Sequence, residues 1–303
     1  MTIKRIDLNN LSYKTNYSSD VTEREKLYHL FESVFGIHSG TLRDFSNKGL
    51  WNDNYIPYTY FNGDKAVANV SAFPLAMIIN GELKNCMGIQ SVMTDPDYRK
   101  NGLMKVLVQK MLNDIDHTSE GAFLFTSSPQ LYTPFGFKEV KQYYFKKEFN
   151  QQSIKQKYSL RKLEPLTDSI HLKMLADVFK KRQHLSTVFA PLSYLECLYF
   201  NLYDPWIYER LYFIEELKLI IVFEVQDGIL RMYDVIGESI PSLEEVCSCI
   251  PYNFHSIEFY FNPDSFALDD IMAIEFKTEN TLMARGLFQL EKGFFMMPLT
   301  SEF

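Results

Sequence analysis

A short basic loop is the first place where residue types and spacing in this sequence point to chemistry. Arg99, Lys100, Asn101 and Gly102 stand directly before an amphipathic run over 103–115. A helix that begins there presents free backbone N–H groups and a partial positive charge, to which the two cations add. Gly102 lets an anion approach the backbone closely. The loop therefore indicates a phosphate or pyrophosphate site, although its pattern is neither GxxxxGK[ST] nor GxGxxG. Taken alone, it fits an ordinary basic turn better, so the surrounding elements must decide.

The elements that position this loop are indicated by the hydrophobic period along the first half of the chain. Helical spacing predicts helices at 22–34, 42–48 and 103–115. β-rich runs predict strands at 55–61, 65–79, 82–94, 121–127 and 137–149, with a helical turn at 131–135. Asn62-Gly63 and Asn80-Gly81 are strong hairpin signals, so the first three strands form an antiparallel meander. The third strand, the loop, the helix and the next strand then make a β-α-β crossover, which is normally right-handed.

The second half of the chain repeats this order of elements. Helices are predicted at 169–182, 193–202 and 241–249, and strands at 160–163, 208–214, 217–226, 229–236, 257–261, 281–288 and 293–298. The repeated order indicates an internal duplication. The phosphate loop is not repeated, because Glu238, Glu244 and Glu245 follow Gly237 and would repel a diphosphate. We therefore expect the second copy not to hold such a ligand.

Length, composition and charge limit the classes of function. The chain has 303 residues, of which 46% are hydrophobic and 23% charged, as in a globular protein with two domains. Residues 1–150 hold 17 Lys or Arg and 16 Asp or Glu, whereas residues 151–303 hold 14 and 22. An acidic chain without a basic stripe is a poor nucleic-acid binder. Solvated acidic faces explain the asymmetry most simply, and attraction of a cationic ligand is the alternative.

The sequence predicts neither a metal site nor a membrane segment. Cys247 and Cys249 are the only close pair among four cysteines, and this spacing fits no zinc site. So few cysteines without a pattern point to a reducing compartment. The N-terminal residues MTIKRIDLNNLSYK have no apolar run behind their charges, so no signal peptide is expected. No run approaches the 18 apolar residues of a membrane-spanning helix, and a cytoplasmic protein is the expectation.

Two segments at the expected separation give the chain a family resemblance. VMTDPDYRKNGLM (92–104) and LFTSSPQLYTPFGF (124–137), in this order of elements, resemble the GNAT (Gcn5-related N-acetyltransferase) superfamily. Arg99 and Gly102 match the family's acetyl-CoA loop, [QR]-x-x-G-x-[GA], whereas Met104 stands where Gly or Ala is usual. The resemblance implies an α/β fold of two tandem GNAT-like units. Each unit would be a mostly antiparallel sheet with a central β-α-β crossover and flanking helices.

The resemblance also implies a division of the chain and a set of site residues. Residues 1–148 would be the catalytic domain, 149–158 a linker and 159–303 a second, degenerate GNAT-like domain. Acetyl-CoA would lie where two strands of the sheet separate. The residues implied to bind it are Val92, Met93, Thr94, Arg99, Lys100, Asn101, Gly102, Leu103, Met104 and Ser127. Tyr132 stands where the family often has a general acid, and its phenol, with a pKa of about 10, is protonated at neutral pH.

The general base is less clear from the sequence. The strand at 82–94 carries Gln90 and Ser91 near its end but no carboxylate, and Glu82 lies at its far end. The chain also resembles the Eis-like (enhanced intracellular survival) tandem acetyltransferases, in which the C-terminal carboxylate of a Phe serves as base. This sequence ends in Phe303, although Eis-like proteins are longer and carry a third domain. A chance terminal aromatic residue is the alternative.

The expected function is acetyl-CoA-dependent N-acetylation of a primary amine by direct attack. Two alternatives stay open: a non-catalytic acyl-CoA sensor and a tandem-GNAT aminoacyl transferase of the peptidoglycan-bridge type. The expected acceptor is a small-molecule or peptide amine of cationic character, with no nucleic-acid, membrane or metal partner. A homo-oligomer is left open, and the sequence does not identify the acceptor.

Overall fold

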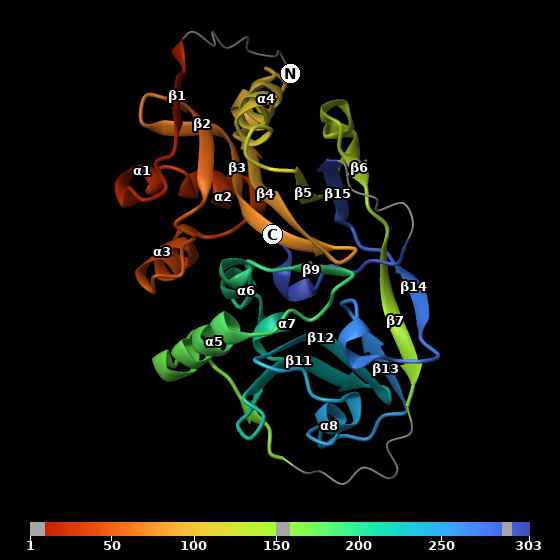
Figure 1. Ribbon diagram of the computed structural model, residues 1–303. Coiled ribbons are helices and arrows are strands. Elements are labelled where there is room, and N and C mark those ends of the chain that lie inside the picture. The colour runs from red at the N-terminus through yellow and green to blue at the C-terminus, as the bar shows by residue number, and fades with distance from the viewer. Residues whose placement is uncertain (1–9, 150–157, 287–292) are drawn as a thin grey trace.

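The chain folds around two mixed β-sheets that helices flank (Figure 1). The computed structural model describes residues 10–149, 158–286 and 293–303. All but the two end residues of the predicted linker at 149–158 therefore lie outside the described residues.

The first sheet has the strand order β1-β2-β3-β4-β5-β15-β6, and β9 pairs with β3 off this path. The bounds are β1 (Ser12–Thr15), β2 (Ile56–Asn62), β3 (Lys65–Ile79), β4 (Glu82–Thr94), β5 (Gly121–Thr126), β6 (Lys138–Glu139), β9 (Phe189–Pro191) and β15 (Thr281–Gly286). Strands β2, β3 and β4 are consecutive antiparallel neighbours, and β4 and β5 are parallel. Gly63 and Gly81 adopt the left-handed φ angles of +60° and +81° that the two hairpin turns require. The predicted meander and crossover are confirmed.

Helices of the first half cover this sheet. They are α1 (Val21–Glu25), α2 (Tyr28–Phe35), α3 (Ser39–Asn47) and α4 (Leu103–Ile115). The single helix predicted at 22–34 is two helices, separated by a turn at Lys26 and Leu27. The side chain of Asp20 caps α1 by accepting from the backbone of Glu23. Helix α4 buries Leu107, Met111 and other apolar residues of one face, as its period predicts.

The second sheet repeats the order of the first. Read from its other edge it is β8-β10-β11-β12-β13-β7-β14. The bounds are β7 (Gln142–Glu148), β8 (Arg161–Lys162), β10 (Leu211–Ile214), β11 (Leu219–Gln226), β12 (Ile229–Gly237), β13 (Ser256–Phe259) and β14 (Met272–Phe276). Its helices are α5 (Ser169–Lys181), α6 (Leu195–Asn201), α7 (Pro205–Tyr208) and α8 (Leu243–Cys247). Strands β12 and β13 are parallel, like β4 and β5. Two mixed sheets of the same order confirm the predicted fold class of tandem units.

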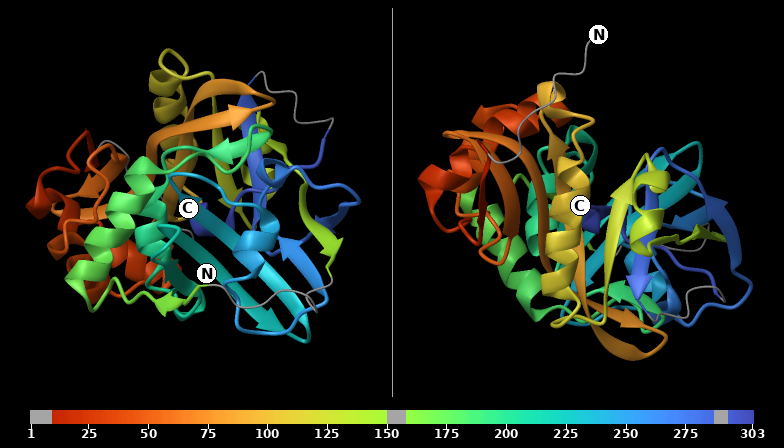
Figure 2. Two further views of the ribbon diagram at one scale, coloured as in Figure 1. Left: turned by 60° about the horizontal axis from the view of Figure 1, so that its bottom comes forward. Right: turned by 90° about the horizontal axis from the view of Figure 1, so that it is seen from above.

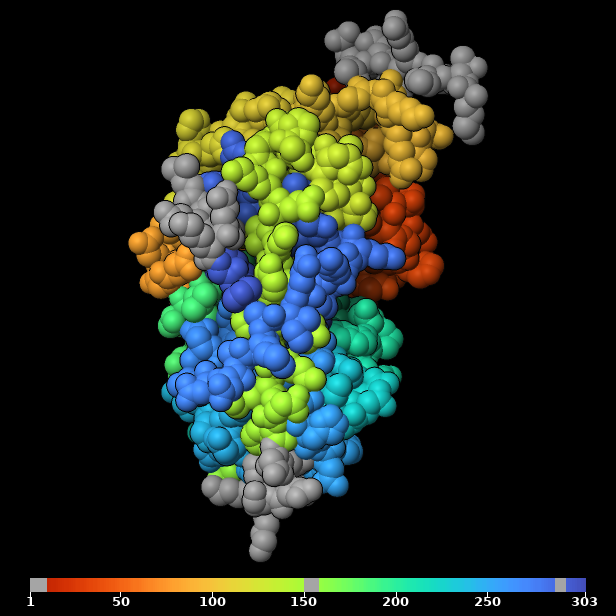
Figure 3. All heavy atoms as spheres, turned by 90° about the vertical axis from the view of Figure 1, so that its right-hand side faces the viewer, coloured from red at the N-terminus to blue at the C-terminus, as the bar shows by residue number. Residues whose placement is uncertain are grey.

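The two halves exchange one strand. Strand β7, from the first half, pairs with β13 and β14 in the second sheet, and β15, from the second half, pairs with β5 and β6 in the first. The single strand expected at 137–149 is therefore β6 and β7, which belong to different sheets. The strand expected at 293–298 forms one isolated bridge, between Phe295 and Gln142. Figure 3 shows the yellow-green residues of the first half among the blue residues of the second on this face.

A shared core joins the halves between the sheets. It contains Phe73 and Phe123 of the first sheet together with Phe189, Phe213 and Ile220 of the second half, all nearly inaccessible to solvent. The end of the chain also lies between the halves, at the centre of both views in Figure 2. The division at residues 149–158 stays a prediction, and the exchanged strands and shared core cross it. No helix in the described parts of the chain is long and apolar enough to cross a membrane.

Candidate active site

Strands β4 and β5 separate where the first half is expected to bind its ligand. Their parallel pairing runs from Cys86 opposite Gly121 to Ile89 opposite Leu124 and goes no further. Beyond this point β5 pairs on its other edge with β15, to Thr126 opposite Thr281. The backbone of β4 after Ile89 therefore faces a gap on its β5 side.

A bulge in β4 shapes this gap. The register with β3 shifts between Asn69 and Ser71, and Ser91 has a left-handed φ of +54°. The buried amide of Asn69 holds the bulge by donating to the carbonyl of Ser91 and to the hydroxyl of Ser71, each at 2.8 Å. Thr59 donates to the Asn69 side-chain oxygen at 2.7 Å. The strained residue is thus fixed by a buried polar network, so the edge of the gap is preorganised.

The basic loop lies at the end of β4 and turns sharply into α4. Lys100 and Gly102 have left-handed φ angles of +65° and +77°. The guanidinium of Arg99 donates to the carbonyl of Thr94 at 3.3 Å, and Asn101 donates to the carbonyl of Arg99 at 3.1 Å. A Cβ added at Gly102 would meet no atom within 4 Å. The glycine is therefore required by its backbone angle, and the first turn of α4 opens onto free space.

One cavity of about 970 Å³ connects the gap, the loop and the second half. Seven of the predicted site residues line it: Val92, Thr94, Arg99, Met104, Ser127, Tyr132 and Phe303. Met93 and Leu103 are buried in core clusters, so only their backbones are available to a ligand there. Lys100, Asn101 and Gly102 are not part of the lining. Apart from the charge of Lys100, they can therefore act on a ligand only through their backbone. The structure thus brings residues that are far apart in the sequence to one cavity.

Tyr132 lies between two short 3₁₀ turns, Pro129–Leu131 and Thr133–Phe135, after β5. Its ring packs edge-to-face on Phe137, with 6.2 Å between the centroids, and only 6% of the residue is exposed. Burial raises the pKa of Tyr132 to about 12. The phenol is therefore protonated at neutral pH and able to donate a proton into the cavity.

The C-terminal residues 298–303, here the tail, enter the cavity from the second half. The ring of Phe303 packs edge-to-face on Phe73 and Phe125, at 5.0 and 5.4 Å between centroids. Asn201 of α6 donates to the carbonyl oxygens of Thr300 and Glu302, at 3.1 and 2.9 Å. The tail is therefore attached to the first sheet by its ring and to the second half by its backbone.

A buried carboxylate of β12 fixes the tail further back. The hydroxyl of Thr300 hydrogen-bonds Asp234, which also accepts from the Tyr194 hydroxyl at 2.8 Å and from the backbone of Val235 at 2.8 Å. Burial raises the pKa of Asp234, and these hydrogen bonds counteract part of that effect. Asp234 follows Tyr233, where β12 has already left its pairing with β13. The place where β12 and β13 separate in the second sheet thus holds the carboxylate that anchors the tail.

Glu302 is a cavity residue that the sequence did not single out. It lines the cavity beside Phe303, and burial raises the pKa of its carboxyl, an effect that a hydrogen bond with Asn280 opposes in part. The resemblance pointed to the terminal carboxylate of Phe303 and not to the acidic side chain one residue earlier. The sequence does contain a sign of this residue, because Glu302 is the only acidic side chain in the last six residues.

Helices α6 and α7 of the second half form the remaining wall. Glu196, Phe200, Asp204 and Trp206 from this region line the cavity. These residues are not among those that the sequence pointed to. None of these residues belongs to a recognisable motif, because the wall depends on how the halves pack.

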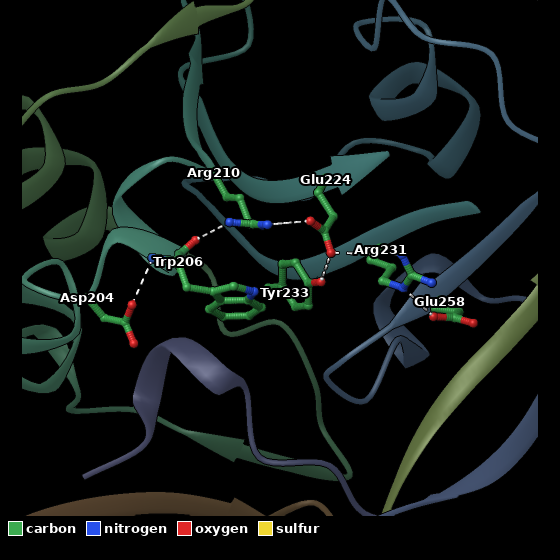
Figure 4. A network of polar contacts seen from close by, with 7 residues as sticks. All are labelled: Asp204, Trp206, Arg210, Glu224, Arg231, Tyr233 and Glu258. Carbon is green, nitrogen blue, oxygen red and sulfur yellow. Dashed lines mark hydrogen bonds and ion pairs between the residues drawn. The ribbon is translucent and has the colours of Figure 1, made fainter. Parts of the chain in front are cut away.

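A polar network holds this wall to the second sheet (Figure 4). Arg210 donates to the carbonyl of Trp206 at 2.8 Å and to Glu224 at 2.9 and 2.5 Å. Tyr233 donates to the other oxygen of Glu224 at 2.7 Å, and its ring meets that of Trp206 at 4.5 Å. Arg231 forms an ion pair with Glu224 and donates a hydrogen bond to Glu258 at 3.0 Å. The charges are partly buried and mutually paired, so removing one leaves its partner uncompensated.

Replacing Arg210 by leucine is expected to lower the free energy of unfolding by about 2 kcal/mol, the range for a hydrogen bond to a charged group. Urea unfolding monitored by circular dichroism measures the change. Arg43 pairs with Glu25 at 3.6 Å on the surface, and its replacement by leucine is the control, with an expected change below about 0.5 kcal/mol. Equal effects of the two substitutions would contradict the structural role of the network.

Residues 18–140 match the family model of the acetyltransferase (GNAT) domain. The separated strands, the basic loop and Tyr132 lie around one cavity. This segment of the first half is therefore similar to a GNAT acetyltransferase domain. No curated protein matches the sequence. In the described parts of the chain no group of three or more His, Cys, Asp or Glu could hold a metal ion.

Several solved structures resemble this chain over at least 90% of its length. A probable N-acyltransferase of Enterococcus faecalis has a TM-score of 0.57 and 13% identity over 92% of this chain and 72% of its own. Eis1 of Mycobacterium abscessus has a TM-score of 0.58 and 12% identity over 90% of this chain and 72% of its own. A GCN5-related N-acetyltransferase of Anabaena variabilis has a TM-score of 0.56 and 15% identity over 90% of this chain and 72% of its own. At such identities the likeness concerns the fold alone.

Proposed function

We propose that the protein transfers the acetyl group of acetyl-CoA to a primary amine. The observation that carries the proposal is that the strand gap, the basic loop and Tyr132 open into one cavity. The gap offers the unpaired backbone of β4 to an extended chain such as pantetheine. The loop offers backbone N–H groups and the charges of Arg99 and Lys100 to a pyrophosphate.

The residues of the cavity can perform a direct transfer. The acceptor amine first loses a proton to a base, and its nitrogen then attacks the thioester carbonyl of acetyl-CoA. A C–N bond forms, the C–S bond breaks and the sulfur leaves with its electron pair. Tyr132 gives its proton to that sulfur, and the second proton that the nitrogen loses as the amide forms restores the phenol. We propose the Glu302 carboxylate as the base. The terminal carboxylate of Phe303 stays the alternative from the sequence, and both acids lie on the anchored tail.

Isothermal titration with CoA tests the binding step. A dissociation constant in the micromolar range is expected, as for the substrates of most enzymes. The complete absence of heat at about 1 mM CoA, the upper end of that range, would contradict the proposal. The acyl-CoA sensor is a second candidate, because Met104 narrows the cavity where the family has a smaller residue. CoA binding without acetylation of any amine would favour the sensor.

Replacing Tyr132 by phenylalanine is expected to lower kcat about a hundredfold, at the low end of general acid catalysis. The effect is limited because a thiolate, with a pKa of about 8.5, is a tolerable leaving group without protonation. Because burial raises the pKa of Tyr132 to about 12, the wild-type rate should not fall on the alkaline side up to about pH 10. Stopped assays of CoA release between about pH 6 and 10 measure both effects.

Phenylalanine keeps the edge-to-face contact of position 132 with Phe137. Thermal unfolding of the Tyr132→Phe chain should therefore match that of the wild type. An unchanged kcat would exclude Tyr132 as the acid, and an alkaline loss of rate below about pH 9 would assign the acid to a group of lower pKa.

A further inference from the structure

The part of the cavity away from the CoA loop is built mainly of aromatic rings. Phe45 of α3, Trp51 after it, Phe200 of α6 and Trp206 of α7 line it and are here called the aromatic wall. Phe45 meets Trp51 at 5.9 Å and Phe200 at 5.4 Å between centroids, both edge-to-face. Phe45, Trp51 and Phe200, which come from both halves of the chain, thus form one continuous apolar surface, and Trp206 adds a further ring to the lining.

The aromatic wall is held in place from behind. The guanidinium of Arg24 lies 4.5 Å from the ring centroid of Trp51, and this buried arginine donates to the carbonyl of Ser18 at 2.6 Å. Trp206 rests on Tyr233, within the polar network of the second sheet. Binding an apolar group there costs little side-chain ordering, because the rings are already fixed.

Charge in the cavity favours a cation near these rings. Glu196 of α6, Asp204 before α7 and Glu302 of the tail all line the cavity. Among the described residues that line it, Arg99 is the only arginine or lysine, and it lies at the α4 end. An ammonium group is therefore attracted to the side opposite the loop, where aromatic faces favour it as well.

We propose that the acceptor is a hydrophobic monoamine, a primary amine attached to one aromatic or branched aliphatic group. This inference rests on the proposed transfer of acetyl to an amine and specifies its substrate class. The aromatic wall takes the apolar group and the carboxylates take the ammonium. A polyamine or an amino sugar would bring further ammonium or hydroxyl groups against the rings of Phe45 and Phe200, which offer them no hydrogen bond, and burying such groups there is unfavourable.

Amine binding to the CoA-saturated protein tests the proposal without any turnover. Isothermal titration compares 2-phenylethylamine, propylamine and spermidine at one pH and ionic strength. A buried phenyl group should strengthen binding, so 2-phenylethylamine is expected to bind at least about tenfold more tightly than either of the others. Spermidine binding as tightly as 2-phenylethylamine would overturn the proposal, as would equal binding of the two monoamines or none by any amine.

Variants connect this preference to the aromatic wall. Phe200→Ala should remove most of the advantage of 2-phenylethylamine over propylamine and leave the affinity for CoA unchanged. Phe266, which packs on Phe259 and Phe261 in the second half and does not line the cavity, supplies the matched control, Phe266→Ala. An equal loss in both variants, or an unchanged preference in Phe200→Ala, would contradict the role of the wall.

Turnover separates this inference from the proposed function. Mass spectrometry of the product with acetyl-CoA should show N-acetyl-2-phenylethylamine. Selective binding of this amine without acetylation would contradict the proposed transferase activity and leave the binding preference established. Acetylation of spermidine in preference would keep the transferase and reject the hydrophobic acceptor.

Discussion

Gly102→Asp is expected to weaken CoA binding at least a hundredfold. Gly102 has a φ of +77° and directly precedes the first turn of α4. An aspartate there strains the backbone and sets a negative charge beside the expected diphosphate. At about 5 Å and an effective dielectric constant of about 20, two like charges repel by roughly 3 kcal/mol, which is more than a hundredfold in affinity. Isothermal titration with CoA measures the loss.

Gly81→Asp is the matched control for this substitution. Gly81 has a φ of +81°, a Cβ added there would also meet no atom within 4 Å, and the residue lies at the opposite end of β4. Both variants should lose similar stability through backbone strain, whereas only Gly102→Asp should lose CoA. Equal CoA affinities in the two variants would show that the loop is an ordinary basic turn.

Glu302→Gln is expected to lower kcat/KM about a thousandfold while CoA affinity stays within about twofold of the wild type. The amide keeps the size of the side chain and its hydrogen bond with Asn280 but cannot take a proton from the amine. Steady-state assays of CoA release, with titration of CoA as a second readout, measure the effect. In the wild type the rate should rise through a pKa above that of an ordinary glutamate, since burial raises the pKa of Glu302.

Stability distinguishes this role from a structural one. The raised pKa means that the folded chain holds the proton of Glu302 more tightly than the unfolded chain does. Folded-state stability therefore falls as pH rises from the unfolded pKa to the folded pKa, and it stays lower above both. At pH 8 the Glu302→Gln chain should thus be as stable as the wild type or more stable, although nearly inactive. A lower Tm would point to a structural role instead.

A chain extended by Gly-Ser after Phe303 separates the two carboxylates. The extension moves the terminal carboxylate away from its place and leaves Glu302 in its own. Near-normal turnover of the extended chain supports Glu302 as base. Loss of turnover in the extended chain together with full activity of Glu302→Gln would assign the base to Phe303.

Local patterns were sufficient to predict most of the elements and the sharp turn into α4. Asn-Gly pairs at 62–63 and 80–81 form the hairpin turns, in which the glycines have left-handed backbone angles. The residues Arg99–Gly102 form the predicted turn into α4. The order of elements in the second half was likewise sufficient to indicate the repeat. These features depend on residues that are neighbours in the sequence, so the sequence alone contains them.

Features that depend on distant contacts were missed. The run 137–149 has no turn signal at Val140 and Lys141, yet the chain changes sheet there. Strand β14 has only five residues, none of them fully buried, and such a short run shows no clear hydrophobic period. The aromatic wall and Glu302 belong to the site only because the halves pack face to face. Hydrophobic period identifies a buried face but does not identify the surface that covers it.

The strand exchange has a consequence for the growing chain on the ribosome. The sheet that carries the CoA loop is complete only when residues 281–286 have been made and have paired with β5. Until then the edge of β5 is open, and β7 waits for β13, which is more than a hundred residues downstream. Both sheets must therefore close late and together, in a slow step that is dominated by long-range pairing. Truncation anywhere before β15 would leave an exposed strand edge prone to aggregation.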